Sequence, residues 1–246
     1  GLGDVYKRQG LSFGDSSMGW AVGAEGTVLK TEDGGRSWTS QEVPVITHLR
    51  EACFVDENLG WIAGGPTGDE TCEAVIMKTL DGGASWTPQS TDFTIRCMCA
   101  VDADHIFIAG GNVFRRSTDG GATWTQHETG HGGWYGSVFF VDTSRGWISG
   151  GAGFIARTLD GGVNWDVLNG GTGRSIVELF FLNADQGWFV ASNPGTMAAS
   201  DDGGASLHFQ THPTGANLRD VTFLDDQTGW LAGEEGLILK TTTGGW

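Results

Sequence analysis

His127 and His131, with Glu128 between them, match the H-E-x-x-H pattern of zinc proteases. That pattern binds zinc on a helix, where residues four apart place both imidazoles on one face. Here the stretch follows a predicted edge strand and runs into two glycines, so we expect no helix. The other alternative for a metal is a looser surface site that uses His48, His127, His131 or His212. We therefore predict no metal site and no cofactor.

The 30 Asp and Glu residues invite comparison with glycoside hydrolases. Such an enzyme needs two carboxylates that face one sugar bond, and outside the repeated positions the sequence establishes no such pair. Ten aspartates instead recur in two fixed positions of a repeat, where Asp side chains bond the backbone of turns. We interpret these as structural and predict no catalytic residue: Asp15, Asp33, Asp56, Asp81, Asp102, Asp119, Asp142, Asp160, Asp202 and Asp225.

Four arginines are the main candidates for binding a partner. Arg50, Arg96 and Arg219 each lie eleven residues before a repeated aromatic residue, and Arg174 lies three residues further upstream in its own repeat. If the repeats form a propeller, these positions gather at one mouth of its channel. In a chain of net charge −16 they would form a local positive site for a carboxylate or an acidic peptide tail. The alternative is that each pairs with a neighbouring Asp or Glu and holds blades together.

Trp134 and Tyr135 are a second candidate for partner binding. They lie outside the repeated aromatic positions, side by side in a Gly-rich link. Adjacent aromatic side chains in a loop can anchor a partner; the alternative is that they pack as a lid over the sheet beneath them. The insertion from Gly65 to Ala74 is predicted on the same end of the molecule, where the repeats differ most.

Four cysteines do not determine the redox compartment. Cys97 and Cys99 are two residues apart on a predicted strand, and Cys53 holds the position of Cys99 in the previous repeat; Cys72 is the fourth. We favour buried small apolar residues over a disulfide or a metal site.

The candidate residues lie within a repeat that is marked by a nine-residue motif. Lys30 to Trp38 recurs as Lys78 to Trp86, Arg116 to Trp124 and Arg157 to Trp165, with a weaker copy at Ala199 to Leu207 and an incomplete one at Lys240 to Trp246. The steps between copies are 48, 38, 41, 42 and 41 residues, a period typical of repeat architectures. Asp-Gly-Gly between apolar runs indicates a hairpin, to which a Ser or Thr two places earlier adds a hydroxyl partner.

A second marker precedes each hairpin and completes a four-strand unit. An apolar run ends in Asp or Asn, and five residues later comes Trp, or Phe107 in the third unit. Four antiparallel strands every ~40 residues predict an all-β fold, a β-propeller with six visible blades. We expect the native ring to hold six or seven. The first-to-second and third-to-fourth strand turns should share one end of each blade, and the other loops and the links between blades the opposite end.

The domain boundaries follow from the repeat. Residues 1–9 resemble a translated sequencing adaptor, so we exclude them and expect a fragment that is open at both ends. Residues 10–246 form the propeller, with units at 10–45, 46–90, 91–130, 131–170, 171–213 and 214–246. No run approaches the ~18 apolar residues of a membrane helix, so we expect no membrane-spanning segment. The acidic balance also disfavours nucleic acid as a partner.

The combined unit resembles a known family. Ser/Thr-x-Asp-Gly-Gly-x-Ser/Thr-Trp is similar to the Asp-box, or bacterial neuraminidase repeat, of sialidases, xyloglucanases and sortilin-type receptors. Its coupling to apolar-Phe-x-Asp-x-x-x-Gly-Trp-x-x-Gly, as in Val221 to Gly233, is most similar to the photosystem II stability/assembly factor family. The resemblance implies a non-enzymatic, extracytoplasmic propeller of the periplasm, thylakoid lumen or secreted space that binds the precursor of a membrane protein. The alternative is a secreted, glycan-active propeller of sialidase or xyloglucanase type.

Overall fold

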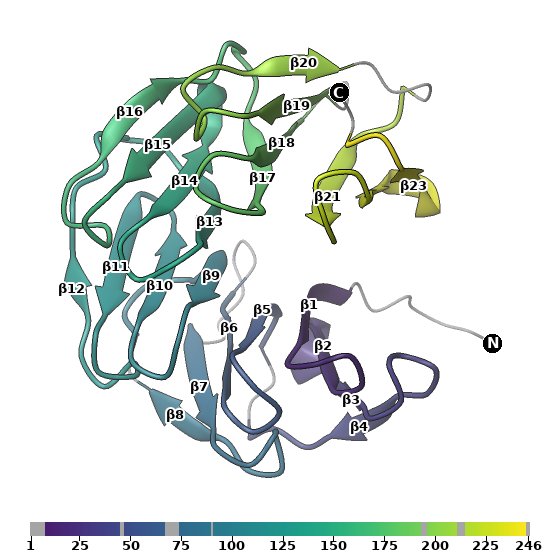
Figure 1. The fold of residues 1–246 in the computed structure, drawn as a ribbon. Coiled ribbons are helices and arrows are strands. Elements are labelled where there is room, and N and C mark those ends of the chain that lie inside the picture. The colour runs from purple at the N-terminus through teal and green to yellow at the C-terminus, as the bar shows by residue number, and fades with distance from the viewer. Residues whose placement is uncertain are drawn as a thin grey trace. The chain divides into compact units, whose positions relative to one another are not determined.

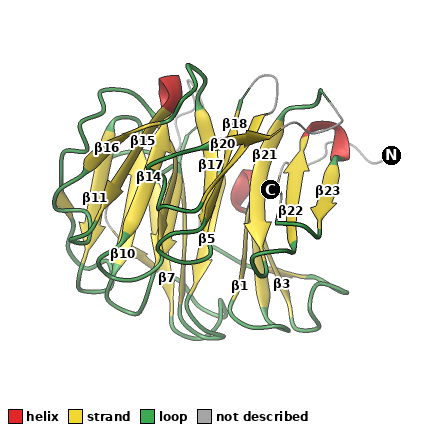
Figure 2. Cartoon of the chain, turned by 45° about the horizontal axis from the view of Figure 1, so that its top comes forward, coloured by secondary structure: helices red, strands yellow, loops and turns green. Residues whose placement is uncertain are grey.

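The computed structural model describes residues 8–44, 47–66, 74–89, 91–192, 196–210 and 215–244. These residues form β-strands and three short 3₁₀ turns, η1 (Ala24–Gly26), η2 (Gly151–Gly153) and η3 (Glu234–Gly236) (Figures 1 and 2). Within the described part of the chain, no helix has the length and apolar character needed to cross a membrane.

The strands pair antiparallel in chain order into six sheets, called blades from here on. Blade 1 contains β1 (Arg8–Phe13), β2 (Gly19–Gly23), β3 (Val28–Thr31) and β4 (Thr39–Gln41). Blade 2 contains β5 (Leu49–Phe54), β6 (Gly60–Gly64), β7 (Val75–Thr79) and β8 (Thr87–Gln89). Blade 3 contains β9 (Cys97–Ala100), β10 (Ile106–Gly110), β11 (Val113–Ser117) and β12 (Thr125–Gln126).

The remaining blades repeat the pattern. Blade 4 contains β13 (Tyr135–Phe140), β14 (Gly146–Gly150), β15 (Phe154–Thr158) and β16 (Asp166–Asn169). Blade 5 contains β17 (Ile176–Phe181), β18 (Gly187–Ala191), β19 (Thr196–Ser200) and β20 (His208–Gln210). Blade 6 contains β21 (Leu218–Phe223), β22 (Gly229–Gly233) and β23 (Ile238–Thr241). The predicted all-β propeller of antiparallel blades is confirmed. β1 begins at Arg8, inside the segment that the sequence analysis set aside.

The chain divides into two compact units. The first comprises residues 1–111 and 115–125, and the second residues 112–114 and 126–246. Within the first unit β1 packs against β5, and β5 against β9; within the second, β13 packs against β17, and β17 against β21. Within each unit, consecutive blades therefore contact each other through their first strands.

Each turn between a first and a second strand begins with an Asp or Asn whose Oδ1 accepts two backbone N–H groups. Asp142, for example, accepts the N–H of Ser144 at 2.8 Å and of Arg145 at 2.7 Å. The equivalent residues are Asp15, Asp56, Asp102, Asn183 and Asp225. A carboxylate that is used in this way braces a turn and is a poor candidate for chemistry.

In the Asp-box the Ser or Thr hydroxyl is buried, whereas the Asp carboxylate is more exposed. Ser117 is 2% exposed, and its Oγ accepts the N–H of Gly121 at 2.8 Å and donates to Asp119 Oδ1 at 2.7 Å. The exposed Asp119 also accepts the N–H and the hydroxyl of Thr123, and these hydrogen bonds hold its pKa at about 2. Blade 6 has no Asp in its box, yet Thr241 Oγ1 still accepts the N–H of Thr243 at 3.2 Å.

We therefore expect Ser117→Ala to destabilise the protein more than Asp119→Ala. The Ser117 change leaves the buried N–H of Gly121 without an acceptor, which costs about 1–3 kcal/mol. The groups freed by Asp119→Ala can bond water instead. Urea unfolding of the two variants measures the difference, with Glu128→Ala as a surface control. A larger loss for Asp119→Ala would show that the carboxylate holds the box together.

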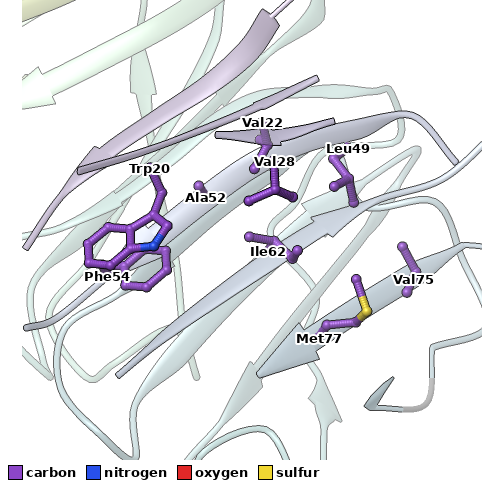
Figure 3. Packing of buried hydrophobic residues seen from close by; sticks show 9 residues of the cluster. All are labelled: Trp20, Val22, Val28, Leu49, Ala52, Phe54, Ile62, Val75 and Met77. Atoms are coloured by element: carbon purple, nitrogen blue, oxygen red, sulfur yellow. The ribbon is translucent and has the colours of Figure 1, made fainter. Parts of the chain in front are cut away.

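Between blades, a tryptophan from the second strand stacks on a phenylalanine from the next blade's first strand. Trp20 lies over Phe54 with ring centroids 3.5 Å apart, in a cluster with Val22, Val28 and Ile62 (Figure 3). Its Nε1 donates to the carbonyl of Gly82, in the Asp-box of that next blade, at 3.0 Å. Trp147 on Phe181 and Trp188 on Phe223 repeat the stack, at 3.5 and 3.6 Å. One side chain thus joins the first strand and the box of the following blade.

The same phenylalanine explains the glycine of the Gly-Trp pair. A Cβ on Gly187 would lie 2.5 Å from the Phe181 ring, so the position opposite Phe181 has no room for a side chain. Blade 3 contains the reverse combination, in which Ala100 replaces the phenylalanine and Ile106 replaces the glycine across the same register. Ile106 is fully buried in a cluster with Trp61. The two substitutions compensate because they keep the volume beside the tryptophan filled.

Candidate partner-binding site

The loop between the second and third strands lies at the same end of each blade as the link from the preceding blade, as predicted. The loop after the second strand bonds the link that enters the same blade: Gly151 N–H donates to Trp134 O at 3.1 Å, and Glu234 N–H to Asn217 O at 2.9 Å. The two turn types meet at the other end, where Gly161 N–H donates to Ser144 O at 2.8 Å. The candidate arginines lie in the links or at the start of the first strands. They therefore lie at the end of the blades that bears the links.

Arg50 and Arg219 each bond the loop after the second strand of their own blade, and Arg174 bonds the first residue of β19. In the first unit Arg50 Nη2 donates to Pro66 O at 3.3 Å. In the second unit Arg174 Nη1 donates to Thr196 Oγ1 at 3.4 Å, and Arg219 forms an ion pair with Glu234. Arg96 is exposed, and its backbone N–H bonds Ala109 O. The ion pair of Arg219 is the pairing with an acidic neighbour that the sequence analysis weighed as the alternative.

Trp134 and Tyr135 differ in exposure. Tyr135 is 1% exposed, and its hydroxyl bonds Thr129 Oγ1 at 2.5 Å. Trp134 is half-buried, and its indole lies against Gly151. Tyr135 therefore follows the packing alternative, because a buried ring cannot contact a partner. Trp134 remains a candidate.

The H-E-x-x-H stretch lies in an extended link after β12, with no helix over residues 127–131. The His131 ring stacks on Phe154 at 4.1 Å, so it packs as an aromatic side chain. Among the described residues, no three His, Cys, Asp or Glu side chains are grouped to hold a metal ion. His212 lies outside the described residues.

Three of the cysteines lie in described strands, where Cys97 is buried and Cys53 and Cys99 are half-buried. Cys53 Sγ accepts the N–H of Ala100 from the next blade at 3.0 Å, and burial raises its pKa to about 11. Such a thiol is protonated and unreactive at neutral pH. Cys72 lies outside the described residues, as does most of the 65–74 insertion.

Two contacts of acidic residues were not predicted from the sequence. Glu178 on β17 accepts a hydrogen bond from the Ser137 hydroxyl on β13; burial, followed by the charge of Asp220 on β21, raises its pKa to about 8. These three residues hold the same position of three consecutive first strands. That shared position is a signal that aligning the repeats would have revealed. The second contact is the ion pair of Glu234 with Arg219. Aligning the repeats would have revealed it too, because Glu234 is an acid at a position where blades 1 and 4 have Ala24 and Gly151.

A family model described as Photosynthesis system II assembly factor YCF48 matches residues 6–95. Comparison with curated proteins finds no match. A solved structure of YCF48 bound to D1 peptide is similar to this chain with a TM-score of 0.76 and 22% identity, over 99% of this chain and 80% of the other. YCF48 from Cyanidioschyzon merolae gives a TM-score of 0.65 and 19% identity, over 98% and 97%.

The fold is shared more widely than the sequence signature. The GH74 xyloglucanase from Xanthomonas campestris gives a TM-score of 0.80 at 13% identity, over 98% of this chain and 44% of the other. At such identities the likeness establishes architecture alone. The predicted family resemblance is confirmed by the sequence model, and the chain is a β-propeller whose residues 6–95 match the Photosynthesis system II assembly factor YCF48 family.

Proposed function

We propose that this chain is a non-enzymatic, protein-binding propeller that acts in photosystem II assembly. The observation that carries the proposal is the match of residues 6–95 to the assembly-factor model. A protein of the same fold and family name has been solved with a D1 peptide bound. By this proposal the chain works in an extracytoplasmic compartment, the thylakoid lumen or its equivalent, on the precursor of a membrane protein.

The surface proposed for this role is the end of the blades that bears the links. There the guanidinium groups of Arg50 and Arg174 bond neutral acceptors, a carbonyl and a hydroxyl. The guanidinium group of an arginine is positively charged at neutral pH. A carboxylate of an acidic peptide tail can then form charge-assisted hydrogen bonds with these groups.

Titration of a fluorescein-labelled synthetic D1 peptide, followed by anisotropy, tests the proposal. Arg50→Glu/Arg96→Glu in the first unit and Arg174→Glu/Arg219→Glu in the second are each expected to weaken binding at least about tenfold, since each removes charge-assisted bonds. Arg36→Glu is the matched control, because Arg36 is an exposed arginine of an Asp-box turn at the other end of its blade. Absence of binding by the unmodified protein would overturn the proposed function.

The glycan-active alternative needs a carboxylate pair directed at a sugar. Glu178 and Asp220 are neighbouring carboxyl groups, but Glu178 is already bonded to the Ser137 hydroxyl and to the backbone N–H of Leu179. Those bonds occupy it within the packed first strands. Hydrolysis of xyloglucan or a sialoside that is lost in Glu178→Gln would favour the alternative instead.

A further inference from the structure

Arg219 bonds a carboxylate that comes from its own blade. Glu234 in η3 forms an ion pair with Arg219 Nη2, and its second oxygen accepts Asn217 Nδ2 at 2.9 Å. The hydrogen bonds from Arg219 and Asn217 lower the pKa of Glu234, so it is charged at neutral pH. Two side chains from the link and β21 thus converge on one acid from the loop.

The turn itself does not require this acid. The equivalent turns of blades 1 and 4 have the same shape, with positive φ at the central residue, 55° at Glu25, 55° at Ala152 and 58° at Glu235. Ala24 and Gly151 stand there in place of Glu234. Gly151 makes the same backbone bond to its link as Glu234 does. The carboxylate of Glu234 is therefore free to serve a purpose other than folding the turn.

The ion pair is also accessible. The Arg219 side chain is 57% exposed and that of Glu234 42%. Ion pairs at this exposure are weak because water screens them and holds both partners nearly as well. An incoming carboxylate can therefore replace Glu234 at Arg219, but it must displace this resident anion.

We propose that Glu234 is a built-in competitor for the acidic partner, occupying the Arg219 guanidinium that the partner's carboxylate would bind. This inference rests on the proposed function, since it assigns Arg219 to the peptide site. Glu234 then limits the affinity of Arg219 for the partner's carboxylate. It favours partners that carry enough negative charge to displace it. Asn217 retains Glu234 when the exchange takes place, so the acid stays in position to return.

The test compares two variants that each remove one negative charge from the same turn. Glu234→Gln is expected to tighten binding of the fluorescein-labelled D1 peptide about 3- to 10-fold, whereas Glu235→Gln, with no role in the pair, should change it less than about twofold. Introducing Arg219→Gln should abolish the gain from Glu234→Gln. Equal effects of the two Glu variants would overturn the inference and leave the proposed function intact.

A second measurement does not depend on the peptide. Phenylglyoxal modifies accessible arginines, and mass spectrometry of the digest gives the rate for Arg219 alone. We expect this rate to rise in Glu234→Gln and to stay unchanged in Glu235→Gln. An unchanged rate in both would show that the ion pair does not protect Arg219 in solution, and would overturn the inference. If the unmodified protein and all variants fail to bind the peptide, the proposed function is wrong and the inference falls with it.

Discussion

Phe181→Ala is expected to lower the free energy of unfolding by about 3–5 kcal/mol, the usual cost of removing a buried phenylalanine. The Phe181 ring is 2% exposed and stacks on Trp147 of the preceding blade at 3.5 Å. Its removal leaves a cavity beside the tryptophan that joins blades 4 and 5. Chemical denaturation with tryptophan fluorescence measures the loss.

The chain itself supplies a rescue for this variant. Blade 3 fills the same space with Ala100 and Ile106 in place of the phenylalanine and glycine. Gly187 has no positive φ, so its backbone accepts isoleucine. We expect Phe181→Ala/Gly187→Ile to recover part of the loss, and Gly187→Ile alone to destabilise the protein because its side chain meets the Phe181 ring. Additive effects of the two substitutions would contradict this account of the repeat.

Glu178→Gln is expected to stabilise the protein at pH 8 and to have little effect at pH 4. Burial, and then the neighbouring Asp220, raise the pKa of Glu178 from 4.5 to about 8. Below pH 4.5 the group is protonated in both the folded and unfolded states, so it imposes no penalty. As the pH rises from 4.5 to 8, Glu178 ionises in the unfolded state but stays largely protonated in the folded state. The free energy of unfolding therefore falls by up to about 1.4 kcal/mol per pH unit.

The expected gain at pH 8 is therefore about 4 kcal/mol as an order of magnitude. Glutamine keeps an oxygen that can accept the bonds of Ser137 and Leu179, so the change isolates the charge. Urea unfolding of the unmodified protein and the variant across pH 4–8 gives the difference directly. Glu128→Gln, at an exposed position, is the control. A difference that does not change with pH would show that Glu178 ionises normally in the fold.

The local parts of the molecule could be predicted from the sequence because short-range chemistry determines them. Asp142 and its equivalents bond N–H groups two and three residues away, and the box hydroxyls bond a glycine four residues away. Such bonds depend only on residue type and spacing. Repeated every ~40 residues, they indicated the turns, the strands and the propeller.

The roles of individual side chains within the repeat were harder to assign. Both the Ser117 hydroxyl and the Asp119 carboxylate belong to the motif, but only packing shows that the hydroxyl is the buried one. Tyr135 and Trp134 are adjacent in the sequence and equally aromatic, yet one is buried and the other is half-buried. The register of β13 shifts between Tyr135 and Ser137, so alternation from the buried Val138 and Phe140 does not predict that Tyr135 is buried.

The sequence alone determined the repeating blade, its turns and the end of each blade that bears the arginines. The tertiary structure decided which groups meet across blades: Trp147 on Phe181, Ser137 with Glu178, and the effect of Asp220 on the pKa of that glutamate. These partners are 34 to 42 residues apart in the chain, so no local spacing rule links them. Their contacts arise only when one blade packs against the next, and that packing also half-buries Glu178 and raises its pKa.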